Sequence, residues 1–439
     1  MRLRVDGSWR RFDDVVLAGS PLRLFRLTPG GTAVAAAIEA GHDVQRSTLT
    51  DRLTDAGAAH PVRPPGDAPH FGVDDVAVVT PQLGGVAHGD GRITVDDGSV
   101  PPIVGASRRL ETNRGPAAAR NAARPLLATP LVAFLDADVV TPDPDWIAAL
   151  LWHFDDQRVA LVAPRVRGEA RSPLDLGDRP GRIRAGTRVS YVPGAALVVR
   201  VEALDAVGGF DELLRFGEDV DLVWRLDDAG WHCRYDPSVT VWHEPRSTWR
   251  DRLRQHAGYG TSAAPLALRH PRALSPVHVN GWTAATWALA LVGQPVSAVA
   301  LATASSAALV RTLPGVPPSA SLGLAMRGHL LAGRQFAEAA RRVWWPILAV
   351  AALRSRRARW WLALAVLADV RRAPTDVAYG WGVWVGVRRL RTLAPLLPRL
   401  SAWPPRRPPR RPTRAGASPI RRSPAPRLEP PPAPGADGR

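Results

Sequence analysis

The chain contains no lysine and a single cysteine, Cys233. A lone cysteine cannot form an intrachain disulfide, which excludes a disulfide-stapled fold and fits a reducing compartment. The segment 1–12 also lacks an apolar run of signal-peptide length, so we expect the N-terminus to stay in the cytoplasm. Apolar residues still make up 46% of the sequence, which is enough to bury a sizeable core.

Positive charge is unevenly distributed along the chain. All 57 basic residues are arginine, against 40 acidic residues, and the formal net charge is +17. Residues 399–439 hold ten arginines against Glu429 and Asp437, so this tail alone carries +8. A solvated tail is the simplest explanation, and attraction to anionic lipid is the alternative. Because the rest of the chain is only moderately basic, we expect no nucleic-acid partner.

The composition divides the chain into several units, since 439 residues are too many for one ordinary domain. The expected units are a small α+β domain at 1–62, a Pro/Gly-rich linker at 63–73, an α/β domain at 74–270, a helical membrane-associated region at 271–394 and a disordered Pro/Arg-rich tail at 395–439.

Local patterns place the expected elements within these units. In the first unit, the segments 15–17 and 22–27 predict two strands joined by a turn, and Thr28 and Pro29 predict the start of a helix, with a second helix at 47–53. In the α/β unit, strands are expected at 76–79, 93–95, 131–135, 159–163 and 196–199, and helices at 116–128 and 145–154. This alternation favours a mostly parallel sheet covered by helices.

Residues 273–310 contain no Asp, Glu, Arg or Lys, and 281–310 are mostly apolar. That length could form a transmembrane helix, since about 20 residues span a bilayer, but Pro295 breaks the run, so a buried helical hairpin is the alternative. The runs 344–353 and 360–368 begin with Trp pairs, which suits an interfacial position. We expect the protein at the cell membrane, with the α/β unit in the cytoplasm.

The segment 131–138 carries the strongest chemical signal, because a strand runs directly into Asp136 and Asp138. Two carboxylates at the carboxyl end of a strand can hold a divalent cation at the edge where α/β sheets bind ligands. Such a cation, Mg²⁺ or Mn²⁺, neutralises the charge that develops on a diphosphate leaving group. An Asp-x-Asp pair alone is more often a solvated turn, so its context decides.

Four other segments supply that context. They are the acidic pair Asp96–Asp97 after a strand, the loop and small-residue helix at 113–121, the stretch 216–226 with three acids ahead of a helix, and His243 at a strand end. Any one of these segments could have a purely structural role, but a purely structural role does not explain their order and spacing taken together.

Across residues 74 to about 260 these motifs resemble glycosyltransferase family 2, which has the α/β GT-A nucleotide-diphospho-sugar transferase fold. The resemblance implies a nucleotide-sugar donor bound by Thr80, Asp97 (at the uracil), Arg120 and Asp136, a metal bound by Asp138, Asp136 and His243, and catalysis by Asp219 as general base with Glu218 beside it. A packed strand-end histidine is the alternative for His243. Asp221 and Arg225, four residues apart on one helix, more readily form a structural ion pair.

The segment 80–92 departs from the family pattern, in which a full helix joins the first two strands. Only 13 residues separate Val79 from Ile93, and four of them are glycines. A crossover with its helix needs at least about 10–12 residues, and each glycine costs about 1 kcal/mol in a helix. We therefore predict that no normal helix forms there and that donor binding is weakened.

Further segments resemble the mycofactocin-system glycosyltransferases of actinobacteria. They are 171–177, 191–197, 252–265, 327–330 and 341–346, and the winged-helix-like N-terminal unit resembles a peptide-binding chaperone domain of peptide-modifying pathways. The resemblance implies inverting transfer of glucose from UDP-glucose, in β-1,4 chains, to premycofactocin or its precursor peptide. Two alternatives stay open: sugar transfer to a polyprenyl phosphate, and a catalytically impaired paralogue that acts as a scaffold.

Overall fold

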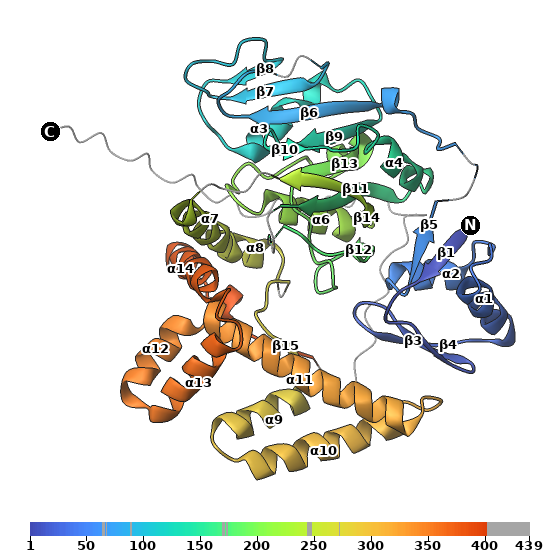
Figure 1. Ribbon diagram of the computed structural model, residues 1–439, viewed down its shortest axis with the longest axis vertical. Coiled ribbons are helices and arrows are strands. Elements are labelled where there is room, and N and C mark those ends of the chain that lie inside the picture. The colour runs from blue at the N-terminus through green and yellow to red at the C-terminus, as the bar shows by residue number, and fades with distance from the viewer. Residues whose placement is uncertain are drawn as a thin grey trace.

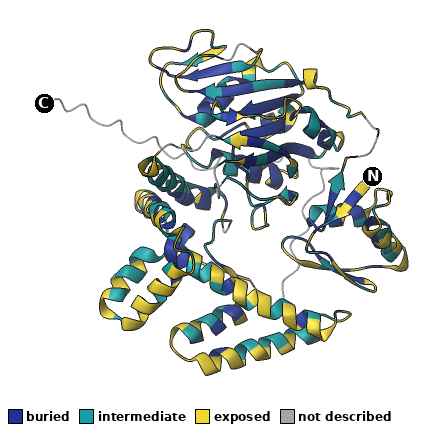
Figure 2. Cartoon of the chain, viewed as in Figure 1, coloured by how far each residue is buried: buried dark blue, intermediate teal, exposed yellow. Residues whose placement is uncertain are grey.

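The computed structural model describes residues 1–63, 66, 68–87, 90–168, 172, 174–243, 248–271 and 273–401. Figure 1 shows a central α/β body, a small N-terminal unit beside it, and a group of helices from the C-terminal part of the chain below it. In Figure 2 the strands of the central body are mainly buried, whereas much of the surface of the C-terminal helices is exposed.

The N-terminal unit combines short strands with two helices. β1 (Arg2–Val5) pairs antiparallel with β5 (Ala59–Val62), and β2 (Arg10–Phe12), β3 (Val15–Ala18) and β4 (Arg23–Arg26) form a second antiparallel sheet. The predicted strand pair is confirmed as β3 and β4. α1 (Pro29–Glu39) starts as predicted, because Thr28 Oγ1 accepts a hydrogen bond from the Gly31 amide at 3.2 Å, and α2 (Thr48–Asp55) is the second predicted helix.

The central sheet contains all five predicted strands. In spatial order it comprises β10 (Val139–Val140), β14 (His232–His243), β11 (Val159–Arg167), β13 (Ala196–Arg200), β9 (Leu131–Leu135), β6 (Val76–Gln82), β7 (Ile93–Asp97) and β8 (Arg108–Leu110), with β12 (Gly181–Ile183) also paired to β14.

The predicted mostly parallel sheet is confirmed, since β6, β7, β8, β9, β11 and β14 run in one direction, but the sheet is mixed because β13 runs antiparallel to both of its neighbours, β9 and β11. The short strand β10 is likewise antiparallel to β14, whereas β6, β7, β8 and β9 form parallel pairs. A parallel return needs a crossover, usually through a helix. The described part of the chain between β11 and β13 contains no helix, so the chain re-enters the sheet from the edge where β11 ends.

Two apolar layers cover the faces of this sheet, and β9 contributes to both because side chains alternate along a strand. Val132 and Phe134 face α3 (Pro116–Ala122), α5 (Val201–Ala206) and α6 (Glu218–Asp228). Leu131, Ala133 and Leu135 face α4 (Ala148–Leu151) and the turn η3 (Trp152–Asp155). No residue of β9 is more than 1% exposed, so the carboxylates that follow it stand on a rigid base.

The predicted helices at 116–128 and 145–154 are shorter than expected. Pro125 lies in the first turn of a separate 3₁₀ segment, η2 (Arg124–Leu126), and cannot donate a main-chain hydrogen bond to continue α3. The second predicted helix is divided between α4 and η3.

The connection from β6 to β7 contains no helix among its described residues, as predicted; residues 88 and 89 lie outside them. β7 nevertheless pairs in parallel with β6, with Val79 opposite Ile93 and Thr80 opposite Thr94. Leu83 and Val86 in this connection are 61% and 77% exposed. Apolar side chains of this connection are therefore left in contact with solvent, and weakened donor binding stays a prediction.

The C-terminal region is a set of helices. It comprises α7 (Trp249–Thr261), α8 (Ala263–Arg269), α9 (Gly281–Leu291), α10 (Pro295–Thr312), α11 (Pro318–Arg342), α12 (Trp345–Arg354), α13 (Arg356–Leu367), α14 (Ala373–Leu390) and the short 3₁₀ helix η4 (Ala394–Leu396). A further 3₁₀ helix, η1 (Val73–Asp75), precedes β6 in the central body. α9 and α10 form the predicted hairpin, divided by Gly293 at φ +83° and by Pro295.

Two expectations about this region are corrected. Among the described residues no helix has both the length and the apolar character needed to cross a bilayer, because the apolar run is split into helices of 11 and 18 residues. The predicted disorder of 395–439 was wrong for its first residues, since β16 (Arg399–Ser401) pairs in parallel with β15 (His278–Asn280). Residues 402–439 lie outside the described part of the chain.

α14 packs so closely against α7 that the backbones of the two helices are in contact. A Cβ atom on Gly260 would lie 2.0 Å from the Tyr379 carbonyl oxygen, and one on Gly382 would lie 1.9 Å from that of Ala257. Only glycine permits this approach. The contact brings residues from more than a hundred positions away to the edge of the sheet where the predicted site residues lie.

Candidate active site

A cavity of about 760 Å³ opens where the chain leaves β9. Its walls are the segment after β9, the loop before β13, the start of α6, one side of α7, and residues of α11 and α14. Six of the eight predicted site residues line it: Arg120, Asp136, Asp138, Glu218, Asp219 and His243. The structure thus brings together acids that lie more than 80 positions apart in the sequence.

Arg120 joins the two acidic motifs of the cavity. Its side chain is almost fully buried, and it donates hydrogen bonds to Asp136 Oδ1 at 2.7 Å and to Glu218 Oε1 at 2.8 Å. It also donates to the Gly194 carbonyl oxygen at 3.1 Å. Burial by itself lowers the pKa of this guanidinium, but the carboxylates of Asp136 and Glu218 raise it well above its ordinary value. These contacts position both motifs, while donor binding by Arg120 stays a prediction.

Glu218 and Asp219 begin α6 side by side but have different partners. Glu218 is buried against Arg120, whereas Asp219 is partly exposed and accepts hydrogen bonds from the amides of Gly194 and Val220, each at 2.8 Å. Burial and the neighbouring Asp219 charge raise the pKa of Glu218 to about 7. Burial also raises the pKa of Asp219. A carboxylate with a raised pKa is a stronger base than one in water.

Asp221 in α6 makes one ion pair within its helix and one contact outside it. Arg225 Nε and Asp221 Oδ2 are 2.6 Å apart, so the predicted helix pair is confirmed. Asp221 also forms a hydrogen bond with His270 Nε2 at 2.9 Å, just beyond the end of α8. Because both partners hold Asp221, the first turn of α6 is fixed relative to the wall of the cavity.

Asp138 and His243 form the part of the site that could hold a metal. The pairing of β10 with β14 sets Val139 opposite His243, and Asp138 Oδ2 lies 3.3 Å from His243 Nε2. A carboxylate oxygen and an imidazole nitrogen both suit Mn²⁺, with further ligands available from a donor diphosphate. Asp136 points to Arg120 instead, and no group of three such ligands occurs among the described residues. Asp138 and His243 are the two members of the predicted metal set whose ligand atoms face each other, and a metal contact of Asp136 stays a prediction.

Asp97 and Thr80 do not line the cavity. The two carboxylate oxygens of Asp97 accept hydrogen bonds from the amides of Arg114 and Gly115, at 2.7 and 2.8 Å, and so hold the loop that precedes α3. Thr80 is buried within β6, and its Oγ1 has no hydrogen-bond partner among the described residues. Their predicted contacts with a donor are untested.

Three residues of the cavity were missed in the sequence. Gly194 supplies its amide to Asp219 and its carbonyl to Arg120, and the segment 191–197 that contains it was noticed only as a resemblance. Arg342 and Tyr379 reach the cavity from α11 and α14, with the guanidinium carbon 4.2 Å from the centre of the Tyr379 ring. Arg342 lies in the segment 341–346, which was noticed only as a resemblance, and Tyr379 lies in none of the segments singled out in the sequence; the packing of the C-terminal helices places both residues there.

Comparisons with known proteins identify relatives of this chain among glycosyltransferases. The model of the family described as "Glycosyltransferase like family 2" matches residues 103–259, which include both acidic motifs. A pre-mycofactocin glycosyltransferase of Mycobacterium tuberculosis is 37% identical over 91% of this chain and 96% of its own length. The chain belongs to this glycosyltransferase family. It is a glycosyltransferase with the GT-A α/β fold and a helical C-terminal region.

More distant relatives share shorter segments with this glycosyltransferase. An N-acetylglucosaminyl-diphospho-decaprenol L-rhamnosyltransferase of Mycobacterium tuberculosis is 43% identical over 18% of this chain and 27% of its own length. Among solved structures, a mannosyltransferase from Pyrobaculum calidifontis in complex with GDP-Man and Mn²⁺ gives a TM-score of 0.36 at 19% identity, over 71% of this chain and 87% of that one. The family assignment rests on the long sequence match.

Proposed function

We propose that this glycosyltransferase moves glucose from UDP-glucose to premycofactocin, with inversion at the anomeric carbon and β-1,4 linkage. The observation that carries the proposal is one cavity lined both by the Asp138–His243 pair and by the Asp219 carboxylate. The acceptor is inferred from the name of the relative that matches almost the whole chain. The N-terminal unit is assigned to binding the peptide-derived acceptor or its precursor.

Asp138 and His243 are the residues that would hold Mg²⁺ or Mn²⁺. When bound, the cation stabilises the negative charge on the departing diphosphate. The chain supplies what the cation needs at this point, namely an oxygen and a nitrogen ligand 3.3 Å apart on neighbouring strands. Arg120 keeps Asp136 turned toward α6, and thereby couples the positions of the two acidic motifs.

Asp219 is assigned as the general base. The acceptor hydroxyl oxygen forms a bond to the anomeric carbon from the face opposite the leaving group, while the bond to the diphosphate oxygen breaks and UDP departs. The hydroxyl proton passes to the Asp219 carboxylate. The Gly194 and Val220 amides fix that carboxylate, so its orientation is set before the acceptor binds.

The reaction is tested with purified full-length protein and UDP-[¹⁴C]glucose, with premycofactocin, polyprenyl phosphate or no acceptor. We expect label in a premycofactocin product, loss of labelling in EDTA, and recovery with added Mn²⁺. An inverted product is checked by the coupling constant of the anomeric proton. Labelling of polyprenyl phosphate alone would replace the proposed acceptor, and no labelling of either acceptor would favour a scaffold.

We also propose that the C-terminal helices hold this enzyme at the cytoplasmic surface of the cell membrane. The support is the exposed apolar surface of α10, α12 and α13, including Val296 at 81%, Leu353 at 80% and Trp360 at 61%. In a flotation experiment with anionic vesicles, we expect the protein to rise with the lipid. The variant Leu353→Glu/Trp360→Glu should stay at the bottom of the gradient. Equal flotation of both proteins would contradict a role for these helices.

A further inference from the structure

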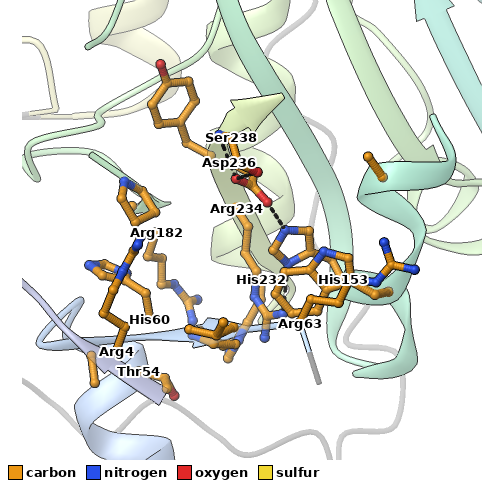
Figure 3. Close-up of a pocket in the computed structure, with 18 residues that line it drawn as sticks. Arg4, Thr54, His60, Arg63, His153, Arg182, His232, Arg234, Asp236 and Ser238 are labelled. Carbon is orange, nitrogen blue, oxygen red and sulfur yellow. Dashed lines mark hydrogen bonds and ion pairs between the residues drawn. The ribbon is translucent and has the colours of Figure 1, made fainter. Parts of the chain in front are cut away.

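A second cavity lies between the N-terminal unit and the central body. It has a volume of about 310 Å³, and Figure 3 shows its lining side chains converging from the two sides. One wall is formed by β1 and β5 of the N-terminal unit and the other by β12, β14 and η3 of the central body. None of its lining residues belongs to the candidate active site.

The charge of this second cavity is strongly positive. Four arginines line it, namely Arg4, Arg63, Arg182 and Arg234. Among the described lining residues the only carboxylate is Asp236, and it is already occupied: its oxygens lie 2.8 Å from His153 Nε2 and 2.6 Å from Ser238 Oγ. Carboxylates outside the lining pair with Arg182 (Asp55 at 2.8 Å and Asp227 at 3.0 Å) and with Arg234 (Asp156 at 2.9 Å), so the excess positive charge of the lining comes from Arg4 and Arg63.

The side chains of the two arginines of the inner wall, Arg182 and Arg234, are only 8% and 13% exposed. Arg234 donates to Asp156 Oδ2 at 2.9 Å, and Arg182 donates to Asp227 Oδ1 at 3.0 Å. The Nε–H of Arg182 is buried and has no acceptor among the described residues. A buried donor without an acceptor is costly, and a bound ligand oxygen would satisfy it.

The two arginines of the outer wall, Arg4 and Arg63, are exposed, and neither forms an ion pair with another described residue. They come from the N-terminal unit, at the strand β1 and just beyond β5. Because they stand opposite the buried pair, a ligand between them would contact both parts of the molecule.

His232, which also lines this cavity, is affected by the charges of nearby arginines. Burial, followed by the charges of Arg182 and Arg158, lowers the pKa of His232 to about 3. Burial likewise lowers the pKa of Arg234 to about 10, although Asp156 opposes the shift. Burial disfavours a charge of either sign, whereas the arginine charges disfavour a further positive charge and favour a negative one.

We propose that this cavity is a binding site for an oxyanion, a phosphate or carboxylate group carried on a small apolar body. Arginine presents a planar set of donors that matches both groups. The apolar part of the lining, Pro61, Val62, Ala149 and Trp152, provides a surface for the rest of the ligand. The ligand joins the N-terminal unit to the central body, and the proposal is independent of the sugar acceptor.

Calorimetry on the full-length protein tests this site with three probes of similar size: phenyl phosphate, benzoate and benzyl alcohol. We expect at least one anion to bind, and the neutral alcohol not to bind. The variant Arg4→Gln/Arg63→Gln should weaken anion binding at least tenfold. The matched control is Arg23→Gln/Arg26→Gln, which removes the same charge from exposed positions of β4 that do not line the cavity.

The result also distinguishes this cavity from the active site, where a phosphate could bind in place of the donor diphosphate. Binding in the second cavity should persist in saturating UDP and should depend on Arg4 and Arg63. Tighter binding of phenyl phosphate would identify a phosphate as the group that the cavity binds, and tighter binding of benzoate would identify a carboxylate. The proposal is overturned if neither anion binds, or if both double variants bind the anions as tightly as the unaltered protein.

Discussion

Asp219→Asn is expected to lower kcat by about 10² to 10⁴, the range that a positioned general base contributes. The amide is nearly the same size as the carboxylate, so its carbonyl oxygen can still accept a hydrogen bond from Gly194 or Val220. It cannot take the proton of an attacking hydroxyl. Turnover with UDP-glucose and premycofactocin measures the loss, and calorimetry with UDP should show donor affinity unchanged.

The matched control for this substitution is Asp228→Asn at the other end of α6, where the side chain is 59% exposed. It should retain kcat, because it removes a charge from the same helix without touching the cavity. Comparable kcat losses in both variants would point to a damaged helix, and full activity of Asp219→Asn would remove Asp219 from the proposed role.

The pH dependence of kcat/KM gives a second test of Asp219 as the general base. A base works only when ionised, so kcat/KM must fall as the pH drops through its pKa. Burial raises the pKa of Asp219, and burial together with Asp219 raises that of Glu218 to about 7. We therefore expect the acidic limb of kcat/KM well above the ordinary carboxyl range near 4. In Asp219→Asn, Glu218 loses its charged neighbour, so its pKa should fall.

Asp138→Ala is expected to lower metal-dependent turnover about a hundredfold or more. A bound divalent cation is worth several kcal/mol of charge stabilisation, and about 1.4 kcal/mol corresponds to each factor of ten. Because His243 alone leaves one protein ligand, Mn²⁺ should no longer tighten UDP binding in calorimetry. His243→Ala should show the same change to a smaller degree, since the carboxylate carries the charge.

Asp145→Ala provides the control for metal binding, because this exposed aspartate lies just after β10, close in sequence to Asp138, but does not line the cavity. Its turnover and its response to Mn²⁺ should match those of the unaltered enzyme. If Asp138→Ala retained a full response to Mn²⁺, the metal would be held elsewhere and the pair with His243 would be only a structural contact.

The elements that build the site follow from local patterns in the sequence. The apolar run 131–135 is a strand because five consecutive apolar residues can be buried only between two layers, and both layers are present. The four glycines of 80–92 predicted that this segment forms no helix, because each glycine destabilises a helix at its own position, whatever packs around it. The motif order likewise identified six residues that share one cavity.

The partners of those residues depend on contacts that local sequence does not encode. Asp136 was expected to bind metal, yet it pairs with Arg120, because burying an arginine is tolerable only when carboxylates surround it. The antiparallel direction of β13 and the positions of Arg342 and Tyr379 in the cavity wall likewise could not be predicted from local sequence. Each results from long-range packing, whose free energy is a sum over residues distant in the chain.

The sequence by itself determined the element types, the acidic motifs at strand ends and the family, because spacing and side-chain chemistry are local properties. Only the tertiary structure decided that Asp138 lies beside His243, that Arg120 holds Asp136, and that Asp219 is partly exposed in the cavity. It also decided that the N-terminal unit closes an arginine-lined cavity against the central body. Those outcomes depend on burial, since removing a charge from water costs free energy unless a partner offsets that cost.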